Sequence, residues 1–299
     1  MIGVDWGTSS TRAYRLATPG EPAVGAVLER REAPAGILHI PPGGFAAALR
    51  EVVGDWIAAG ERRVLLAGMV GSRQGWLEAP YLACPAGLEE IAGALVPVPF
   101  VDAEVRLVPG LRAEDGTGVP EVMRGEEVQV LGVLGTGGTV DPLVCLPGSH
   151  AKWVHVEGGQ VVGFKTSMTG EAYAALRRHT ILGRMMEGDA APSPAFDAGV
   201  ARAAYPGGLL HHLFGARTLA LFGRLSPADG ASYLSGLLIG HEVTASLPEG
   251  GGRVHLVGAG PLMALYARAI ALRGGMASLG DADAAARGLA LIGERASWM

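Results

Sequence analysis

The stretch MIGVDWGTSSTR, residues 1–12, decides the fold. The apolar segment 2–4 runs directly into Asp5 and then into Gly7. This segment is too short for the apolar region of a signal peptide, and no small-residue cleavage site follows it. We therefore expect a buried first strand that brings a carboxylate, a glycine and several hydroxyl groups to one tight turn. The hydroxyl groups belong to Thr8, Ser9, Ser10 and Thr11.

Length and composition narrow the class of protein. A chain of 299 residues with 49% hydrophobic residues is long enough for two domains, each with its own core. The net charge of −5 does not favour binding to nucleic acid or to an anionic membrane surface. The two cysteines, Cys84 and Cys145, form neither a disulfide framework nor a CxxC metal motif. We expect a cytoplasmic protein with no membrane span, and leave a homodimer open.

The apolar spacing predicts alternating strands and helices. Strands are expected at 2–5, 12–16, 23–31, 64–69, 98–101, 106–109, 143–146, 153–156, 161–166 and 253–257. Helices are expected at 45–59, 88–95, 121–134, 169–182, 196–205, 209–222, 228–247, 261–273 and 283–295. The sequence GTGGT at 135–139 is typical of a domain boundary. The chain therefore reads as an α/β protein with domains at 1–136 and 137–299, the second repeating the architecture of the first.

Two glycine turns are candidate phosphate sites. In DWGTSSTR, residues 5–12, backbone N–H groups and hydroxyls near Gly7 form a concavity suited to phosphate. Asp5 would repel phosphates unless a cation lay between them, which favours Mg²⁺ held by Asp5 through water. In LPGSHAKW, residues 146–153, the layout is repeated. Its candidate donors are Gly148, Ser149, His150 and Lys152. The alternative is an ordinary polar turn for the first and an ordinary hairpin with an exposed lysine for the second.

Three further segments carry polar residues that could bind or react. Glu126 and Glu127 lie early in a predicted helix, where acids also simply favour the helix N-terminus. Helical neighbours lie about 100° apart, so at most one of them faces a given site. The loop GMVGSRQGW, residues 68–76, follows a strand, which is where α/β proteins bind ligands. Its candidates are Arg73, Gln74 and Trp76, the last of which could instead cap the core.

The segment GAG at 258–260 does not complete a dinucleotide fingerprint. That fingerprint needs a third glycine three residues after Gly260, and this position is Met263. A dehydrogenase is therefore disfavoured. The absence of GxxxxGK[ST] from the sequence excludes a P-loop kinase.

Taken together, five motifs resemble the 2-dehydro-3-deoxygalactonokinase family, in the sugar-kinase branch of the actin-like ATPase superfamily. They are DWGTSSTR, GMVGSRQGWLEAPYLACPAG, RGEEVQVLG, LPGSHAKWV and TSMTGE, in this order along the chain. The resemblance covers nearly the whole chain and is looser in the last third. It implies two ribonuclease-H-like domains flanking an active-site cleft. It also implies ATP-dependent phosphorylation of the terminal hydroxyl of 2-keto-3-deoxygalactonate, giving the 6-phosphate, in galactonate catabolism.

The resemblance also implies roles for individual residues. Residues 5–12, with Gly7, Thr8, Ser9, Ser10 and Arg12, look like the first phosphate motif, and 146–153 like the second. Gly258 and Gly260 match the adenosine motif. Related sugar kinases carry Gly-Asp-Gln-Gln where this chain has Gly125-Glu126-Glu127, so Glu126 takes the role of base. Because the substrate is an acid, Arg73 is the expected partner of its carboxylate.

Two alternatives of the same fold stay open at this point. One is a kinase for another 2-keto-3-deoxy sugar acid, such as the gluconate epimer. The other is a non-catalytic sugar-sensing relative, which would bind ATP without turnover.

Overall fold

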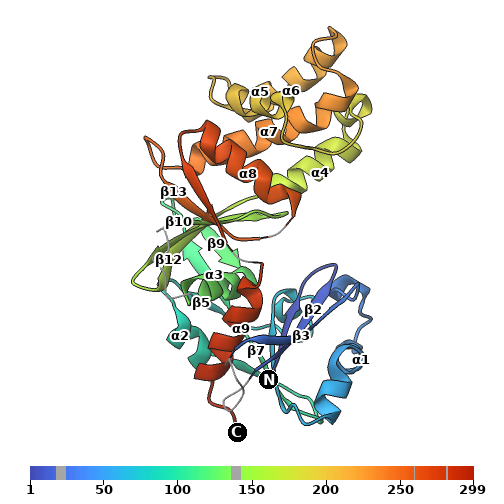
Figure 1. Ribbon diagram of the computed structural model, residues 1–299, viewed down its shortest axis with the longest axis vertical. Coiled ribbons are helices and arrows are strands. Elements are labelled where there is room, and N and C mark those ends of the chain that lie inside the picture. The colour runs from blue at the N-terminus through green and yellow to red at the C-terminus, as the bar shows by residue number, and fades with distance from the viewer. Residues whose placement is uncertain (18–24, 136–142, 259, 281) are drawn as a thin grey trace. The chain divides into compact units, whose positions relative to one another are not determined.

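The computed structural model describes residues 1–17, 25–135, 143–258, 260–280 and 282–299 (Figure 1). The predicted boundary sequence at 135–139 lies outside this part of the chain, apart from Gly135, which follows the last turn of a helix. By its internal contacts the chain forms two compact units. Unit 1 comprises residues 1–140, 154–164 and 281–299, and unit 2 comprises 141–153 and 165–280. The predicted halves differ from these units chiefly because the last helix clusters with unit 1.

Unit 1 is built on a six-stranded mixed sheet in the order β3-β2-β1-β4-β7-β6. Its strands are β1 (Ile2–Trp6), β2 (Thr11–Leu16), β3 (Val27–Ala33), β4 (Arg63–Ala67), β6 (Val96–Val98) and β7 (Glu104–Leu107). β1 pairs antiparallel with β2 and parallel with β4. Strands are therefore present where 2–5, 12–16 and 64–69 were predicted, although β4 ends at Ala67 and Met69 begins a 3₁₀ turn. The strand predicted at 98–101 was wrong by two residues or more, because β6 ends at Val98 and Val101 is exposed.

A smaller sheet of three strands, β5-β8-β9, completes the strands of unit 1. They are β5 (Tyr81–Ala83), β8 (Gly110–Glu114) and β9 (Pro120–Met123). The helical elements of unit 1 are η1 (Ile37–His39), α1 (Phe45–Ala58), η2 (Met69–Gly71), α2 (Leu88–Gly93), α3 (Glu126–Leu134) and α9 (Ala284–Arg295). The helix predicted over 121–134 was wrong at its start, because its first residues belong to β9 and α3 begins only at Glu126.

Strand β1 is buried on both faces, as an interior strand of an α/β sheet must be. Ile2, Val4 and Trp6 point into one core cluster, which also holds the apolar face of α1. That face consists of Phe45, Leu49, Val52, Val53, Trp56 and Ile57. On the opposite face, a Cβ on Gly3 would lie 3.0 Å from Leu289 of α9. Helices thus cover both faces of the sheet (Figure 1).

Helices α3 and α9 cross at van der Waals contact through glycines. A Cβ built on Gly132 of α3 would lie 1.9 Å from the carbonyl oxygen of Ala284. A Cβ on Gly288 of α9 would lie 1.9 Å from the carbonyl oxygen of Val128. Only residues without a side chain permit this approach, so the C-terminal helix fixes the position of α3 in unit 1.

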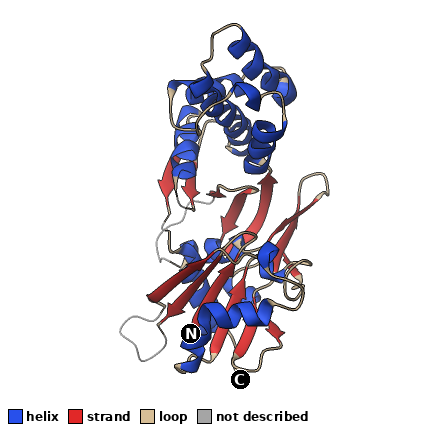
Figure 2. Cartoon of the chain, turned by 90° about the vertical axis from the view of Figure 1, so that its right-hand side faces the viewer, coloured by secondary structure: helices blue, strands red, loops and turns tan. Residues whose placement is uncertain are grey.

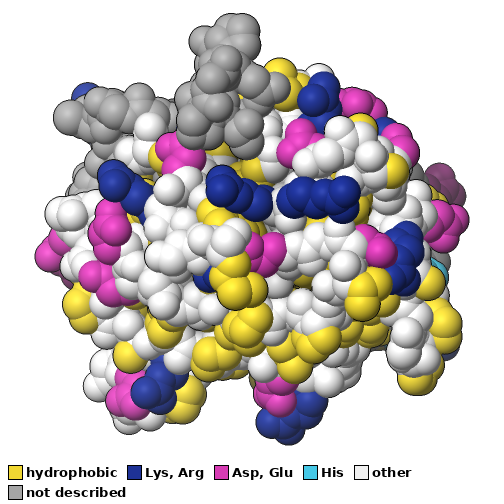
Figure 3. Space-filling model, turned by 90° about the horizontal axis from the view of Figure 1, so that it is seen from below, with side chains coloured by type: hydrophobic (Ala, Val, Ile, Leu, Met, Phe, Trp, Pro, Cys, Tyr) yellow, Lys and Arg dark blue, Asp and Glu magenta, His cyan; other side chains and the backbone are white. Residues whose placement is uncertain are grey.

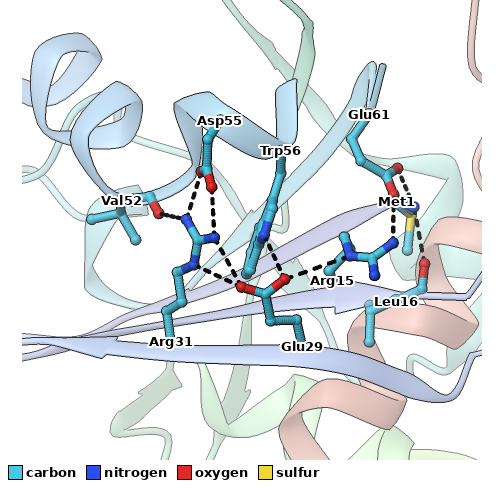
Figure 4. Close-up of polar contacts among 9 residues, drawn as sticks. All are labelled: Met1, Arg15, Leu16, Glu29, Arg31, Val52, Asp55, Trp56 and Glu61. Atoms are coloured by element: carbon cyan, nitrogen blue, oxygen red, sulfur yellow. Dashed lines mark hydrogen bonds and ion pairs between the residues drawn. The ribbon is translucent and has the colours of Figure 1, made fainter. Parts of the chain in front are cut away.

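A polar network ties α1 to strand β3 (Figure 4). The guanidinium of Arg31 donates to both carboxylate oxygens of Asp55, at 2.6 and 2.7 Å, and to the carbonyl oxygen of Val52. It also lies 4.0 Å from the ring centre of Trp56, whose indole N–H donates to Glu29. A planar guanidinium suits both the bidentate carboxylate and the ring stacking, which a lysine could not reproduce.

Unit 2 contains a five-stranded sheet in the order β12-β11-β10-β13-β14, although residues 154–164 of its hairpin cluster with unit 1. The strands are β10 (Leu143–Leu146), β11 (Ala151–Glu157), β12 (Gln160–Ser167), β13 (Arg253–Leu256) and β14 (Met276–Leu279). Its helical elements are α4 (Thr169–His179), η3 (Gly183–Met185), α5 (Pro194–Ala203), α6 (Gly208–Leu221), α7 (Pro227–Ser246) and α8 (Pro261–Leu272). These helices form a layer of their own (Figure 2).

The layer is held together by close helix packing. A Cβ on Gly236 of α7 would lie 2.1 Å from the carbonyl oxygen of Phe196 in α5. Leu234, Leu237 and Leu238 of α7 also share a buried cluster with Leu213 of α6. Both units therefore combine sheets and helices, and the predicted α/β class is confirmed.

The surface carries charges of both signs. On the face in Figure 3, Arg and Lys side chains lie interspersed with Asp and Glu. In the described residues, no helix combines the length and the apolar character needed to cross a membrane.

Candidate active site

The first glycine turn joins β1 to β2 and is held from one side. The N–H of Gly7 donates to the carbonyl oxygen of Ser10 at 2.9 Å, which closes the turn. The segment after β3 lies against it, since Ile37 N–H donates to the carbonyl oxygen of Gly7. A Cβ on Gly36 would lie 2.3 Å from the carbonyl oxygen of Thr8. The side chains of Thr8 and Ser9 stay exposed, so their hydroxyls are accessible to a ligand.

Asp5 is the last residue but one of β1, and its side chain is only 20% exposed. The pKa of Asp5 is raised to about 6, mainly by burial; the charge of Arg12 opposes this rise and the nearby charge of Glu126 adds to it. The guanidinium of Arg12 lies 3.7 Å from the Asp5 carboxylate. Asp5 and Glu126, which are far apart in sequence, therefore share one electrostatic environment in unit 1. A carboxylate with a raised pKa beside a second carboxylate is a favourable place for a cation.

The start of α3 is set by Gly125, whose φ of +105° is a left-handed value that favours glycine. The Oε2 atom of Glu126 accepts from the N–H of Arg124 at 3.0 Å, and Oε2 of Glu127 accepts from the N–H of Gly125 at 2.7 Å. These two carboxylates satisfy N–H groups at the helix N-terminus.

The two acids are buried to different extents. Glu127 is fully buried, and burial together with the charge of Glu126 raises its pKa to about 8. Glu126 is half-buried. Glu126 is therefore the more accessible of the two at the start of α3.

The loop that follows β4 places its three candidates differently. Arg73 is 85% exposed and lies 3.5 Å from Glu78. Gln74 is also exposed. Trp76 stacks on Phe45, with ring centres 6.2 Å apart, and therefore takes part in the core as well as in the loop.

Sequence reasoning missed Arg124, which is only 7% exposed. Its Nη2 atom donates to the carbonyl oxygen of Ala79 at 2.7 Å, and its guanidinium lies 4.3 Å from the ring centre of Tyr81. A signal was present in the sequence. A cation directly before the two acids of a helix N-terminus opposes the helix dipole, which is unusual for a surface residue.

The second glycine turn, in unit 2, lies against the start of α4. A Cβ on Gly170 would lie 2.5 Å from the carbonyl oxygen of Gly148, and Glu171 N–H donates to the carbonyl oxygen of Ser149. His150 pairs through Nε2 with the carboxylate of Glu171. Lys152 is buried, and its ammonium donates to the carbonyl oxygen of His150 at 3.1 Å. Lys152 thus supports the turn from inside.

A cavity of about 220 Å³ lies beside this turn in unit 2. It is mostly apolar, with Gly148 and the start of α4 on one side and α8 on another. Its lining residues are Gly148, Thr169, Gly170, Tyr173, Asp189, Ala190, Ser235, Leu238, Ile239, Leu262, Leu265 and Tyr266. Gly258 and Gly260, with φ of +149° and +80°, lead into α8, so the predicted adenosine motif directs the chain into a cavity-lining helix.

Glu242 of α7 fastens the elements around this cavity. Its carboxylate accepts from Trp153 Nε1 and from the hydroxyl of Tyr266, each at 2.7 Å, and also from the side chain of Thr169. Burial raises the pKa of Glu242 despite these three donors. One buried carboxylate therefore links β11, α4, α7 and α8.

Comparison with known proteins identifies the family. A family model described as 2-keto-3-deoxy-galactonokinase matches residues 5–292 of this chain. The chain belongs to this family. A 2-keto-3-deoxy-galactonokinase is a kinase, so the activity implied by the motifs is confirmed.

Two curated relatives of this 2-keto-3-deoxy-galactonokinase agree with the assignment. One, from Rhizobium meliloti (strain 1021), is named as a probable 2-dehydro-3-deoxygalactonokinase. It is 40% identical over 301 residues, covering 99% of this chain and 96% of the relative. The 2-dehydro-3-deoxygalactonokinase of Escherichia coli (strain K12) is 35% identical over 244 residues, covering 82% and 79%.

Solved structures support the fold of the 2-keto-3-deoxy-galactonokinase. A Sinorhizobium meliloti protein assigned to the 2-dehydro-3-deoxygalactonokinases has a TM-score of 0.88 at 38% identity and covers 98% of each chain. The activator of 2-hydroxyisocaproyl-CoA dehydratase from Clostridium difficile has a TM-score of 0.50 at 12% identity, over 99% and 95% of the two chains. This second likeness concerns the fold alone.

Use of ATP and of a sugar acid follows from membership of this kinase family. The roles of individual residues, a bound Mg²⁺, a homodimer, a cytoplasmic location and the lack of nucleic-acid or membrane partners stay predictions from the sequence.

Proposed function

We propose that this 2-keto-3-deoxy-galactonokinase transfers the γ-phosphoryl group of ATP to the 6-hydroxyl of 2-dehydro-3-deoxygalactonate, with Glu126 as base. The observation that carries the proposal is the shared environment of Asp5 and Glu126. The accessible carboxylate of Glu126 at the start of α3 acts on the carboxylate of Asp5 near the end of β1, beside a turn with exposed hydroxyls. A phosphoryl-transfer site needs this combination of a base, an anchor for a cation and donors for phosphate.

Glu126 would accept the proton of the 6-hydroxyl while its oxygen attacks the γ-phosphorus. The new bond is between that oxygen and phosphorus. The bond that breaks joins the γ-phosphorus to the bridging oxygen, which leaves with its electron pair on ADP. Because the transition state is loose, the proton moves late, and an ordinary carboxylate is a sufficient base.

The residues present fit a magnesium ion. Among the described residues, no three His, Cys, Asp or Glu side chains cluster as metal ligands. Mg²⁺ in kinases is commonly bound by one or two carboxylates together with substrate phosphates and water, so a lone Asp5 suffices. The raised pKa of Asp5 is consistent with a carboxylate that a cation would relieve. When bound, Mg²⁺ would neutralise charge on the phosphates.

Each unit, taken by itself, has a glycine turn with candidate donors for phosphate. In the first, these are the backbone at Gly7, the hydroxyls of Thr8, Ser9 and Ser10, and the guanidinium of Arg12. In the second, Gly148 and Ser149 offer the backbone and a hydroxyl, while His150 and the buried Lys152 hold the turn and add charge. Fixed donors that stabilise developing charge are the largest catalytic contribution in such reactions.

The apolar cavity in unit 2 would hold the adenine base. Its volume of about 220 Å³, its mostly apolar lining and its position beside Gly148 suit a flat base joined to phosphates. Exposed Arg73, with Gln74 and Trp76 on the same loop, would meet the sugar acid, and the guanidinium would bind its carboxylate.

A coupled assay of ADP release across a panel of six-carbon 2-keto-3-deoxy acids tests the proposal. We expect turnover with the galactonate compound, with the phosphate at the 6-position by NMR of the product. Preference for the gluconate epimer would reassign the substrate within the same chemistry. ATP binding without turnover of any acid would contradict the kinase mechanism and favour a sensing role.

A further inference from the structure

Arg124 has an unusual environment for a cation. Its side chain is buried, yet in the described part of the chain its Nε and Nη1 atoms have no hydrogen-bond partner. Its Nη2 atom donates to the carbonyl oxygen of Ala79. Buried donors without partners cost free energy, and a buried charge costs more. Stability alone therefore does not account for this residue.

The guanidinium lies directly beneath the loop that carries Arg73. A Cβ on Gly71 would lie 2.9 Å from Nη1 of Arg124, so the loop backbone rests on the guanidinium because that position is glycine. Ala79 and Tyr81, at the far end of the loop, bind the other side of the same group. The hydroxyl oxygen of Ser72 is a further buried polar atom with no partner among the described residues. Arg124 thus holds both ends of the loop.

Arg124 is also joined to the start of α3. Its backbone N–H donates to Oε2 of Glu126 at 3.0 Å. Its charge also lowers the pKa of Glu127, opposing the effect of burial. The Oε1 atom of Glu127 is buried and has no partner among the described residues. One residue therefore contacts the loop assigned to the sugar acid and the carboxylate assigned as base.

We propose that Arg124 is a positioning residue that makes the site selective for an acid. It fixes the loop carrying Arg73, and its buried positive charge attracts the carboxylate of the substrate. The inference rests on the proposed function, since it assumes that the sugar acid binds at this loop. A charge in a poorly solvated place acts more strongly over several ångströms than an exposed charge such as that of Arg73.

The test compares Arg124→Met, which removes the charge, with Arg124→Lys, which keeps it. Arg62→Met is the matched control, because Arg62 is an exposed arginine of unit 1 that donates to the carbonyl oxygen of Asp102. Each variant is assayed with the sugar acid and with its neutral carboxamide, and melting temperatures are recorded. The wild-type protein is assayed first. If it shows no turnover, the proposed function is wrong; if it turns over, the variants test the role of Arg124.

For Arg124→Met we expect KM for the acid to rise roughly tenfold more than KM for the carboxamide, which rises only because the loop is less well held, while KM for ATP changes less than about twofold. Arg124→Lys loses the contacts to Ala79 and Tyr81, so KM rises for acid and carboxamide together and the preference for the acid is kept. Arg62→Met behaves as wild type. Equal losses for acid and carboxamide in Arg124→Met overturn the proposal. If Arg124→Met does not fold, a wild-type KM for the acid in Arg124→Lys overturns it.

Discussion

Gly68 and Gly125 lie in contact: a Cβ built on Gly125 would lie 3.1 Å from the Cα atom of Gly68. Gly68 follows β4, whose last residue pairs with Asp5, and Gly125 precedes the first residue of α3. Both glycines have positive φ, of +92° and +105°. This contact of two backbones brings Glu126 to the end of β1.

Substituting Gly125 should therefore impair catalysis more than folding. In Gly125→Ala the strained φ costs roughly 1–3 kcal/mol of stability, and the new methyl group displaces the start of α3 from Gly68. A displacement of about 1 Å at the base can cost on the order of a hundredfold in kcat. Steady-state kinetics and thermal unfolding separate the two effects.

Gly118→Ala is the control for Gly125→Ala. Gly118 also has positive φ, of +84°, but a Cβ there would meet no atom within 4 Å. Gly118→Ala therefore has a similar backbone strain, but its new methyl group displaces no neighbouring atom. A loss of kcat in Gly118→Ala as large as in Gly125→Ala would refute the role of the contact.

The two acids of α3 should respond differently to loss of charge. Glu126→Gln removes the accessible carboxylate and should lower kcat by roughly two to four orders of magnitude. Glu127→Gln keeps an oxygen that can accept from Gly125 N–H, so its kcat should change only slightly. Single-turnover measurements with saturating substrates give the comparison. The reverse ranking would transfer the role of base to Glu127.

Glu127 also predicts a pH dependence of stability. Its pKa is about 8 in the folded protein, against an ordinary value of 4.5. The folded state thus binds more protons than the unfolded state between these values, and the free energy of unfolding falls as the pH rises through them. Denaturant unfolding between pH 6 and pH 8 should show this fall. Glu127→Gln should flatten it and raise stability at pH 8 by a few kcal/mol at most.

Asp5 titrates in a lower window, which makes it a control for Glu127. Its pKa is about 6 against an ordinary value of 3.8, so its contribution to the slope has fallen to about half at pH 6 and is nearly gone by about pH 7. Asp5→Asn should leave the fall between pH 6 and pH 8 in place. If Asp5→Asn flattened that range as fully as Glu127→Gln, the assignment to Glu127 would be wrong.

Asp5→Asn should also abolish turnover without unfolding the protein. It removes the charge proposed to hold Mg²⁺ through water, and we expect kcat to fall on the order of a hundredfold or more. The melting temperature at neutral pH should not fall, because a poorly solvated carboxylate becomes a neutral amide. Near-normal turnover at saturating Mg²⁺ would exclude this role.

Much of the fold could be predicted because its signals are local. The apolar run at 2–4 and the spacing of Phe45, Leu49 and Trp56 report burial within one element. The start of α3 could not be placed, because the acids and apolar residues of 121–134 suit a helix throughout. Gly125, which precedes α3 and has a left-handed φ, lies in contact with Gly68, which is distant in sequence. The three strands of the sheet β5-β8-β9 were not predicted either.

The candidate site could be predicted where its polar residues are consecutive in the sequence and form a turn. Asp5 and the hydroxyls of 8–11 are such a case, and so is the turn at 148–150. The burial of Arg124 and Lys152 could not be predicted, because charged residues are normally exposed and these two are covered only once the chain has folded. The packing of α9 in unit 1 likewise depends on Gly132 and Gly288. These glycines permit the close crossing of α3 and α9, which the sequence alone does not reveal.

Finally, Glu242 predicts a nucleotide phenotype that is separate from the sugar acid. Its carboxylate holds Tyr266, which lines the apolar cavity, together with Trp153 and Thr169. Glu242→Gln replaces one acceptor oxygen with an amide NH₂ group, which donates. Either the hydrogen bond from the indole of Trp153 or the one from the hydroxyl of Tyr266 is therefore lost. The cavity wall then loosens, and KM for ATP should rise roughly tenfold while KM for the sugar acid stays within about twofold. Tyr266→Phe removes one hydrogen bond and should show a smaller effect of the same kind.

Glu249→Gln, at an exposed position of unit 2, is the control for loss of a carboxylate. Calorimetric titration with a non-hydrolysable ATP analogue checks the result without turnover. Unchanged nucleotide affinity in a folded Glu242→Gln would show that this cavity does not hold the base.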